Sequence, residues 1–184
     1  MIKHINSFNQ IQLIKKSLVV LDIDKTIIAF PNITNQWWKK TFDKNVVNTS
    51  NIKIAEKLTN DEWCNHISKN NPYILDKKCF KKFVKKINQE DCELVLLTAR
   101  NKRMTDLTHK HLYQCNINIS KDRVFHDENK ADVLATIINT YPKINDIIFV
   151  DDLKKNLLSV KDKFSEDKLS HYALSLYKIA HNYN

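Results

Sequence analysis

Short apolar runs recur along the chain, and each ends in polar residues. The runs cover residues 17–24, 92–100, 123–128, 146–152 and, less clearly, 171–177. Segments with helical spacing lie between the first four runs, at residues 76–87, 103–115 and 130–141. Apolar runs rich in β-branched residues that alternate with helices are typical of a parallel sheet covered on both faces. The pattern therefore predicts the α/β class, as a three-layer, doubly wound parallel sheet.

Residues 30–75 interrupt this alternation and contain all three tryptophans, among them Trp37 and Trp38. The stretch NQWWKKTF within them resembles the start of an amphipathic helix. We interpret the segment as a small helical cap inserted after the first strand of a single domain, whose core would be residues 1–29 and 76–184. Trp37 and Trp38 have two open interpretations, because they could flank an aromatic substrate or pack the cap onto the core.

The composition narrows the chemistry that the chain can perform. The 184 residues include no glycine, so neither a Walker P-loop nor a GxGxxG dinucleotide turn can be built. The net charge of +9 suits an anionic partner, although a solvated lysine-rich surface would give the same value. Only three of the basic residues are arginines, and base-specific reading relies heavily on arginine. Nucleic acid is therefore disfavoured as a partner.

The cysteines and the N-terminal residues bear on the compartment. The four cysteines form no CxxC pair, and none is followed six residues later by arginine, which excludes the cysteine-phosphatase signature. Reduced, structural thiols are typical of a cytosolic protein. The first residues lack the apolar core of a signal peptide, and no run reaches the roughly 18 apolar residues that span a bilayer. We therefore expect a soluble, cytoplasmic protein.

Acidic residues gather where the apolar runs end. In the stretch LVVLDIDKTII, Asp22 and Asp24 are two positions apart, so their side chains would lie side by side at the end of a strand. Polar residues at other segment ends add to this pair: Thr98, Lys130, Asp151 and Asp152. Parallel strands end at one edge of their sheet, where ligands bind in such folds. So many carboxylates would repel one another, and a hard divalent cation, Mg²⁺, is implied.

Four short motifs carry a resemblance to a known family. DIDKT, LLTAR, NKADVL and FVDDLKKN resemble, in order, the four motifs of the haloacid dehalogenase (HAD) superfamily, over about residues 17 to 160. The stretches around the second and fourth motifs look like a bacterial subset of HAD-like proteins of unassigned function. The chain departs from the pattern at Lys25, where many members have glycine, and its short cap leaves the substrate pocket undefined. The resemblance implies a HAD-like Rossmannoid fold.

The same resemblance implies a Mg²⁺-dependent phosphatase that acts through an aspartyl-phosphate. Asp22 would be the nucleophile, and Asp24 would protonate the leaving oxygen and then activate water. Mg²⁺ would be held by the Asp22 side chain, the Asp24 backbone carbonyl and Asp151. Thr98 and Lys130 would hold the transferring phosphoryl oxygens.

Supporting roles follow for other residues of the four motifs. Asp152 and Asn156 would support the metal site from a second layer of side chains. Thr26 would either belong to this layer or only hydrogen-bond the turn after the first strand. Arg100 could bind the substrate phosphate or pair with an acid, and the sequence leaves both alternatives open.

Other basic residues are weaker candidates for the site. Lys121 is the rival of Lys130, although it lies before the third strand and not after it. His109, His111 and His126 are interpreted as surface or packing residues, because a carboxylate site already suits the metal.

The implied substrate is a phosphate ester, and the cap bears on its class. A short cap would leave the site open enough for a phosphate carried by a protein, and the tryptophans could flank an aromatic ring. Phosphotyrosine in proteins is therefore the specific hypothesis. A small phosphometabolite or a nucleotide is the alternative. A hypothesis of another class is a non-catalytic binding or scaffold protein on a HAD fold.

Overall fold

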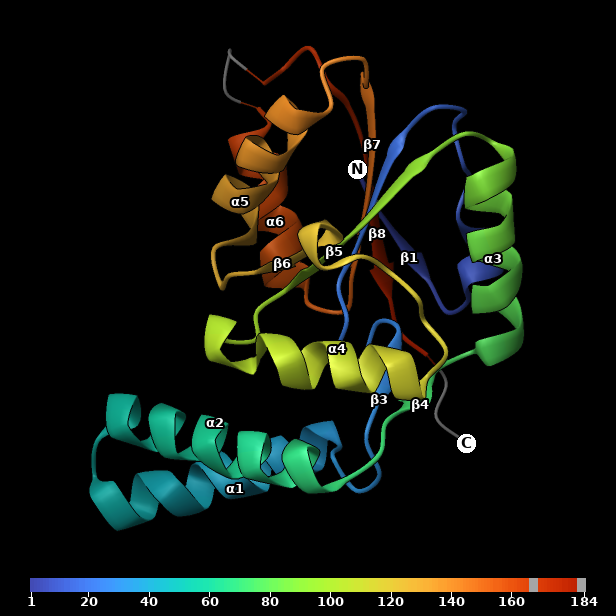
Figure 1. The fold of residues 1–184 in the computed structure, drawn as a ribbon. Coiled ribbons are helices and arrows are strands. Elements are labelled where there is room, and N and C mark those ends of the chain that lie inside the picture. Colours follow the sequence, from blue (N-terminus) through green and yellow to red (C-terminus); the bar gives the residue numbers. More distant parts are fainter. Residues whose placement is uncertain (166–168, 182–184) are drawn as a thin grey trace.

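The computed structural model describes residues 1–165 and 169–181, and within them six strands form one sheet in the order β1-β8-β7-β2-β5-β6 (Figure 1). All neighbouring strands in this sheet are parallel. The strands are β1 (Ile2–Ile5), β2 (Leu18–Leu21), β5 (Glu93–Thr98), β6 (Val124–His126), β7 (Asp146–Asp151) and β8 (Ala173–Ile179). Because β2 lies between β7 and β5, its carboxyl end is in the middle of the edge where ligands bind in such sheets.

Helices cover both faces of the sheet (Figure 1). The α-helices are α1 (Asn35–Thr49), α2 (Ile52–Lys69), α3 (Lys77–Gln89), α4 (Thr105–Gln114), α5 (Lys130–Ile137) and α6 (Lys154–Lys163). The 3₁₀ turns are η1 (Phe8–Gln10), η2 (Lys102–Met104), η3 (Lys121–Arg123) and η4 (Ile138–Thr140). Within the described ranges, no helix is long and apolar enough to cross a membrane. The predicted three-layer α/β arrangement is confirmed.

The central strand β2 contributes to two separate cores. All its residues are buried, and successive side chains point to opposite faces of the sheet. Val19 and Leu21 belong to the cluster that contains the apolar side of α3, whereas Leu18 and Val20 belong to the cluster that contains the apolar sides of α5 and α6. The strand is apolar at every position because both of its faces are covered.

The edge strand β1 was not among the predicted elements. It pairs in parallel with β8, and only Ile5 of its residues is buried. Such a short strand with exposed middle positions leaves no apolar run in the sequence. The turn that follows places Phe8 against Phe80 and Phe83 of α3, with ring centroids 5.1 and 5.5 Å away. These contacts anchor α3 on its face of the sheet.

A helical hairpin follows the first central strand. β3 (Ile28–Ala29) and β4 (Tyr73–Ile74) form an antiparallel pair, and α1 and α2 lie side by side between them in the chain (Figure 1). The buried Asn45 Nδ2 of α1 donates a 3.1 Å hydrogen bond to Thr59 Oγ1 of α2. The small helical insertion that the sequence predicted is thus present, and we call α1 and α2 the helical hairpin.

The lack of glycine forces other residues into left-handed backbone. Among the described residues, those with positive φ are Lys16, Lys25, Asn32, Ser50, Asp76, Asp91 and Asn116. A residue with a Cβ atom is destabilised there by about 1–2 kcal/mol, although asparagine and aspartate adopt this conformation more readily. The two lysines therefore carry backbone strain that glycine would relieve.

Lys16 offers a direct test of this strain, because its φ is 60° and its side chain is exposed. Lys16→Gly should raise the free energy of unfolding by about 0.5–1 kcal/mol, measured by urea denaturation. Lys15→Gly is the matched control, since Lys15 is exposed and its φ is not positive. It should lower the free energy of unfolding by about 0.5–1 kcal/mol. Changes of the same sign in both variants would contradict the strain.

Candidate active site

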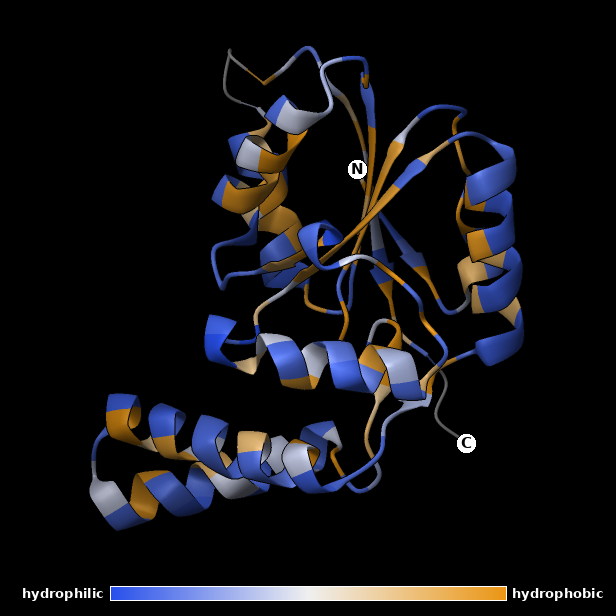
Figure 2. Cartoon of the chain, viewed as in Figure 1, coloured by the Kyte–Doolittle hydropathy of each residue, from blue (hydrophilic) through white to orange (hydrophobic). Residues whose placement is uncertain are grey.

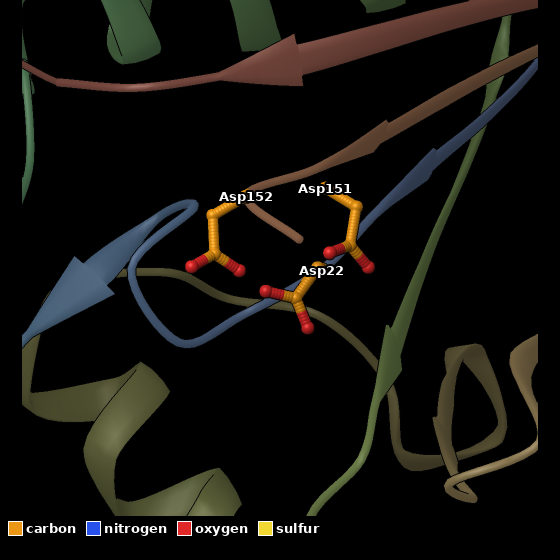
Figure 3. A group of neighbouring side chains, drawn as sticks. All are labelled: Asp22, Asp151 and Asp152. Atoms are coloured by element: carbon orange, nitrogen blue, oxygen red, sulfur yellow. The ribbon is translucent and has the colours of Figure 1, made fainter. Parts of the chain in front are cut away.

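The predicted carboxylates meet at the carboxyl ends of two neighbouring strands. Asp22 follows β2, Asp151 ends β7, and the Asp22 backbone N–H donates a 3.0 Å hydrogen bond to the Val150 carbonyl. One carboxylate oxygen from each of Asp22, Asp151 and Asp152 lies within 4.8 Å of the others. Figure 3 shows the three side chains converging. We call these residues the carboxylate cluster.

Lys130 is the cation in direct contact with the carboxylate cluster. It begins α5 and is 3% exposed, and its Nζ donates to Asp22 Oδ1 at 2.5 Å and to Asp151 Oδ2 at 2.7 Å. Lys121 lies elsewhere, in an exposed ion pair with Asp106 at 3.1 Å. Of the two lysines that the sequence offered, the structure brings only Lys130 into the cluster.

Burial and mutual repulsion act on the ionisation of the carboxylate cluster. Burial raises the pKa of Asp22 to about 8, with Lys130 opposing the change and Asp151 and Asp152 adding to it. Burial, followed by the charge of Asp151, raises the pKa of Asp152 to about 7. Burial alone would lower the pKa of Lys130, but Asp22 and Asp151 outweigh it and raise that pKa.

The charge balance of the carboxylate cluster fits a divalent cation. Among the described residues, three carboxylates face one bonded ammonium, so the ionised cluster holds more negative than positive charge in a buried place. The charge of Lys25, followed by that of Lys130, opposes the rise in the pKa of Asp152. Oxygen ligands in this number are what Mg²⁺ takes from proteins. The expectation had placed Asp152 in a supporting role, but its side chain is one of the three that could hold a metal.

Asp151 is held by the start of α6. Its Oδ1 accepts from the Leu153 backbone N–H at 2.7 Å, and Asn156 Nδ2 lies 3.1 and 3.0 Å from its two oxygens. Asn156 therefore orients Asp151, as a supporting residue of a metal site would.

Asp24 is separate from the carboxylate cluster and is bound by Arg100. The Arg100 Nε and Nη2 atoms each donate to one Asp24 carboxylate oxygen, at 2.7 Å in both cases. The Arg100 side chain is fully buried, whereas that of Asp24 is 24% exposed. Of the two alternatives for Arg100, the structure therefore shows pairing with an acid. The bidentate geometry fixes the orientation of the Asp24 carboxylate.

The rest of the Arg100 guanidinium is enclosed by residues that sequence reasoning did not assign to the site. Nη1 lies 3.3 Å from Thr108 Oγ1 and 3.1 Å from His111 Nδ1. The rings of Phe30 and Trp63 lie 5.7 and 5.8 Å from the guanidinium carbon. Trp63 belongs to α2, so Arg100 connects the Asp24 carboxylate to the helical hairpin. The only sequence signal was the spacing of Thr108 and His111, which places them on one side of a helix.

The histidines have the packing surroundings that we expected. His111 is buried, and burial, followed by the charge of Arg100, lowers its pKa to about 4. His126 is also buried, and its Nδ1 lies 3.3 Å from the Arg100 carbonyl oxygen. His109 is half-buried.

Two threonines of the predicted site, Thr26 and Thr98, are buried. Thr98 ends β5, and its hydroxyl accepts from the Arg100 backbone N–H at 3.2 Å. Thr26 is fully buried, and its carbonyl accepts from His181 Nε2 at 2.8 Å. The Thr26 hydroxyl has no hydrogen-bond partner in the described part of the chain. Among the described residues, the Thr26 hydroxyl therefore does not make the hydrogen bond to the turn that was one of its two interpretations.

Lys25 links the turn after β2 to the helical hairpin. Its φ is 61°, in the left-handed region that favours glycine. Its Nζ donates to Asn35 Oδ1 of α1 at 2.7 Å.

Trp37 and Trp38 lie in the first turn of α1, and both are half-buried. Trp37 packs against the core cluster that contains the apolar side of α3. Its ring centroid is 6.4 Å from that of Trp38 and 6.1 Å from that of His66. Trp37 therefore has the packing role that was one of its two interpretations. Its contact with substrate remains a proposal.

Comparisons with known proteins show similarity at the level of the fold. The sequence matches no protein-family model and no curated protein. A HAD-superfamily hydrolase from Ehrlichia chaffeensis superimposes with a TM-score of 0.51 at 12% identity, over 90% of this chain and 92% of that one. A class C acid phosphatase from Bacillus anthracis gives a TM-score of 0.48 at 15% identity, over 89% of this chain and 66% of that one. The same enzyme with tungstate bound gives 0.46. The hydrolase supports a HAD-like fold.

Arg100 should contribute strongly to stability, because it is the ion-pair partner of Asp24. Arg100→Met should lower the free energy of unfolding by about 3 kcal/mol, since an unpaired, mostly buried carboxylate is left behind. Arg123→Met is the matched control, because Arg123 pairs with Glu93 at 2.6 Å with both side chains more than a third exposed. It should lower that free energy by less than about 1 kcal/mol. Both variants are measured by urea denaturation. Equal losses in the free energy of unfolding would contradict a strong contribution from the Arg100–Asp24 ion pair.

Proposed function

We propose that this protein is a Mg²⁺-dependent phosphatase that transfers a phosphoryl group to Asp22 and then to water. The observation that carries the proposal is the position of Asp22, which is buried between a lysine and two further carboxylates at the carboxyl end of the central strand. Lys130 binds one Asp22 carboxylate oxygen, Oδ1, and fixes the orientation of the side chain. The other oxygen, Oδ2, would then be the atom that attacks phosphorus. The HAD-like fold and the four motifs support the same chemistry.

In the first half-reaction, an Asp22 oxygen attacks phosphorus and the bond from phosphorus to the leaving oxygen breaks. Asp24 would enter this step protonated, give its proton to that oxygen and become the ionised carboxylate that Arg100 binds. In the second half-reaction, Asp24 accepts a proton from water, whose oxygen attacks phosphorus and frees Asp22 and phosphate. Each Asp24 oxygen retains a lone pair beyond its hydrogen bond to Arg100. Arg100 can therefore orient Asp24 while Asp24 accepts this proton.

Other groups of the site act on the charge of the transferring phosphoryl group. Lys130 and Thr98 would donate hydrogen bonds to its equatorial oxygens. Mg²⁺ would be held by the carboxylates of Asp22, Asp151 and Asp152 together with the Asp24 backbone carbonyl. When bound, the ion would supply charge neutralisation for nucleophile and phosphate.

We further propose that phosphotyrosine in proteins is the substrate. The support is the pair of half-buried tryptophans in the first turn of α1. Lys25, which lies next to Asp24 in the chain, donates a hydrogen bond to Asn35 in the same turn of α1. An aromatic ring can stack on an indole, whereas an aliphatic phosphoester cannot.

The nucleophile is tested by Asp22→Asn, which keeps the shape of the side chain but cannot attack phosphorus. Turnover of p-nitrophenyl phosphate in Mg²⁺ should be lost, and thermal unfolding in EDTA should shift upward because repulsion within the carboxylate cluster is relieved. Asp106→Asn is the control, since Asp106 is exposed and away from the cluster. A near-normal kcat for Asp22→Asn would remove the proposed mechanism.

The lysine is tested by comparing Lys130→Ala with Lys121→Ala. Lys130→Ala should lower kcat/KM by about 10²-fold or more through lost transition-state stabilisation. Lys121→Ala should leave kcat/KM nearly unchanged, because its ion pair is exposed. The reverse order of effects would show that the wrong lysine has been assigned.

The substrate class is tested by Trp38→Ala. The variant should lose more kcat/KM on a phosphotyrosine peptide than on a phosphoserine peptide of the same sequence, because only the former can stack. Equal losses on both peptides would mean that Trp38 has a structural role, and the phosphotyrosine proposal would lose its support.

A further inference from the structure

Helix α3 carries a dense group of positive charge on its exposed side. Its sequence, KKCFKKFVKKINQ, contains three adjacent lysine pairs. We define the lysine face as Lys77, Lys78, Lys81, Lys82, Lys85 and Lys86, all of which are exposed. The six side chains carry six positive charges, and the net charge of the whole chain is +9. A single helix thus carries a large share of the excess charge.

The lysine face lies opposite the apolar side of α3. Phe80, Phe83 and Ile87 are buried against the sheet and η1. At 3.6 residues per turn, the lysines form two rows that lie about 100° apart around the helix. Figure 1 places α3 as the outer layer on its side of the sheet, and Figure 2 shows its hydrophilic side turned away from the sheet. The two rows are therefore presented together to the surroundings.

The lysine face is electrostatically unfavourable in the isolated protein. No acidic residue lies within α3, and like charges four residues apart on a helix repel. Lys77 and Lys78 also begin the helix, where the helix dipole is already positive. None of the six lysines makes an ion pair in the described ranges, whereas Lys44 of α1 pairs with Glu62 at 3.2 Å. An external polyanion would relieve this repulsion.

We propose that the lysine face binds the phosphate backbones of double-stranded DNA without reading the base sequence. An α-helix fits the major groove, and two rows of lysine on its flanks would each face one of the strands that border the groove. Lysine contacts to phosphate need no arginine, so the small number of arginines argues only against base-specific reading. Phosphate contacts of this kind bind in a strongly salt-dependent manner.

A membrane is a poorer match for this surface. Among the described residues, none of the exposed large hydrophobic side chains belongs to α3. The proposal uses no residue of the candidate active site, so its outcome is independent of the phosphatase proposal.

The test is fluorescence anisotropy with labelled DNA duplexes of two unrelated sequences, each two helical turns long. The unaltered protein should bind both duplexes equally well. The triple variant Lys77→Gln, Lys81→Gln, Lys85→Gln should bind at least about 10-fold more weakly at low salt, and the slope of log Kd against log salt should fall by about 2 to 3. The control variant Lys40→Gln, Lys53→Gln, Lys57→Gln loses the same charge from the helical hairpin. It should change Kd by less than about 3-fold.

A second measurement uses the unaltered protein and does not depend on how the variants fold. Acetylation of surface lysines, read by mass spectrometry, should be reduced by duplex DNA at the lysine face and unchanged at Lys40, Lys53 and Lys57. The proposal would be overturned by equal losses of affinity in the two triple variants, by uniform protection of all lysines, or by no binding of the unaltered protein. Binding to phosphatidylserine vesicles in place of DNA would also overturn it.

Discussion

Buried negative charge at the carboxyl ends of β2 and β7 is the constraint on which the candidate site depends. Asp22 and Asp151 are nearly or fully inaccessible to water, and Asp152 lies beside them. Lys130 bonds to two of the three carboxylates. Ionised carboxylates in such a place are stable only with compensating charge. The start of α5 therefore supplies a lysine here, and the start of α6 holds Asp151. The negative charge that remains would suit the divalent cation that we propose.

Asp24, the second acid of the candidate site, is held in place by an arginine and not by the carboxylate cluster. Arg100 binds Asp24 in a bidentate manner and is itself enclosed by Phe30, Trp63 and His111. Because Trp63 belongs to the helical hairpin, the orientation of Asp24 depends on how the hairpin packs onto the core. The two acids of the proposed mechanism are thus placed by separate parts of the fold, Asp22 by the charges of the cluster and Asp24 by its ion pair with Arg100.

The sequence predicted the sheet edge and its carboxylates well, because acids directly after buried strands are a local signal. Two features depend on distant contacts and could not be predicted from local patterns. Arg100 binds Asp24, which lies 76 positions away in the chain, and β1 pairs with β8 from the opposite end of the chain. The lysine pairs of α3 were visible in the sequence, but their arrangement as one exposed face required the helix to be placed on its core.

The most direct test of the charge constraint is thermal unfolding of the metal-free protein during titration with Mg²⁺. A cation that binds the folded state stabilises it by about 2.7 kcal/mol at a concentration 100 times its Kd. The unfolding temperature of the unaltered protein should therefore rise with Mg²⁺, and Asp151→Asn should abolish the rise while Asp106→Asn leaves it intact. An unfolding temperature that does not change with millimolar Mg²⁺, or a rise that persists in Asp151→Asn, would contradict a metal-dependent site at this cluster.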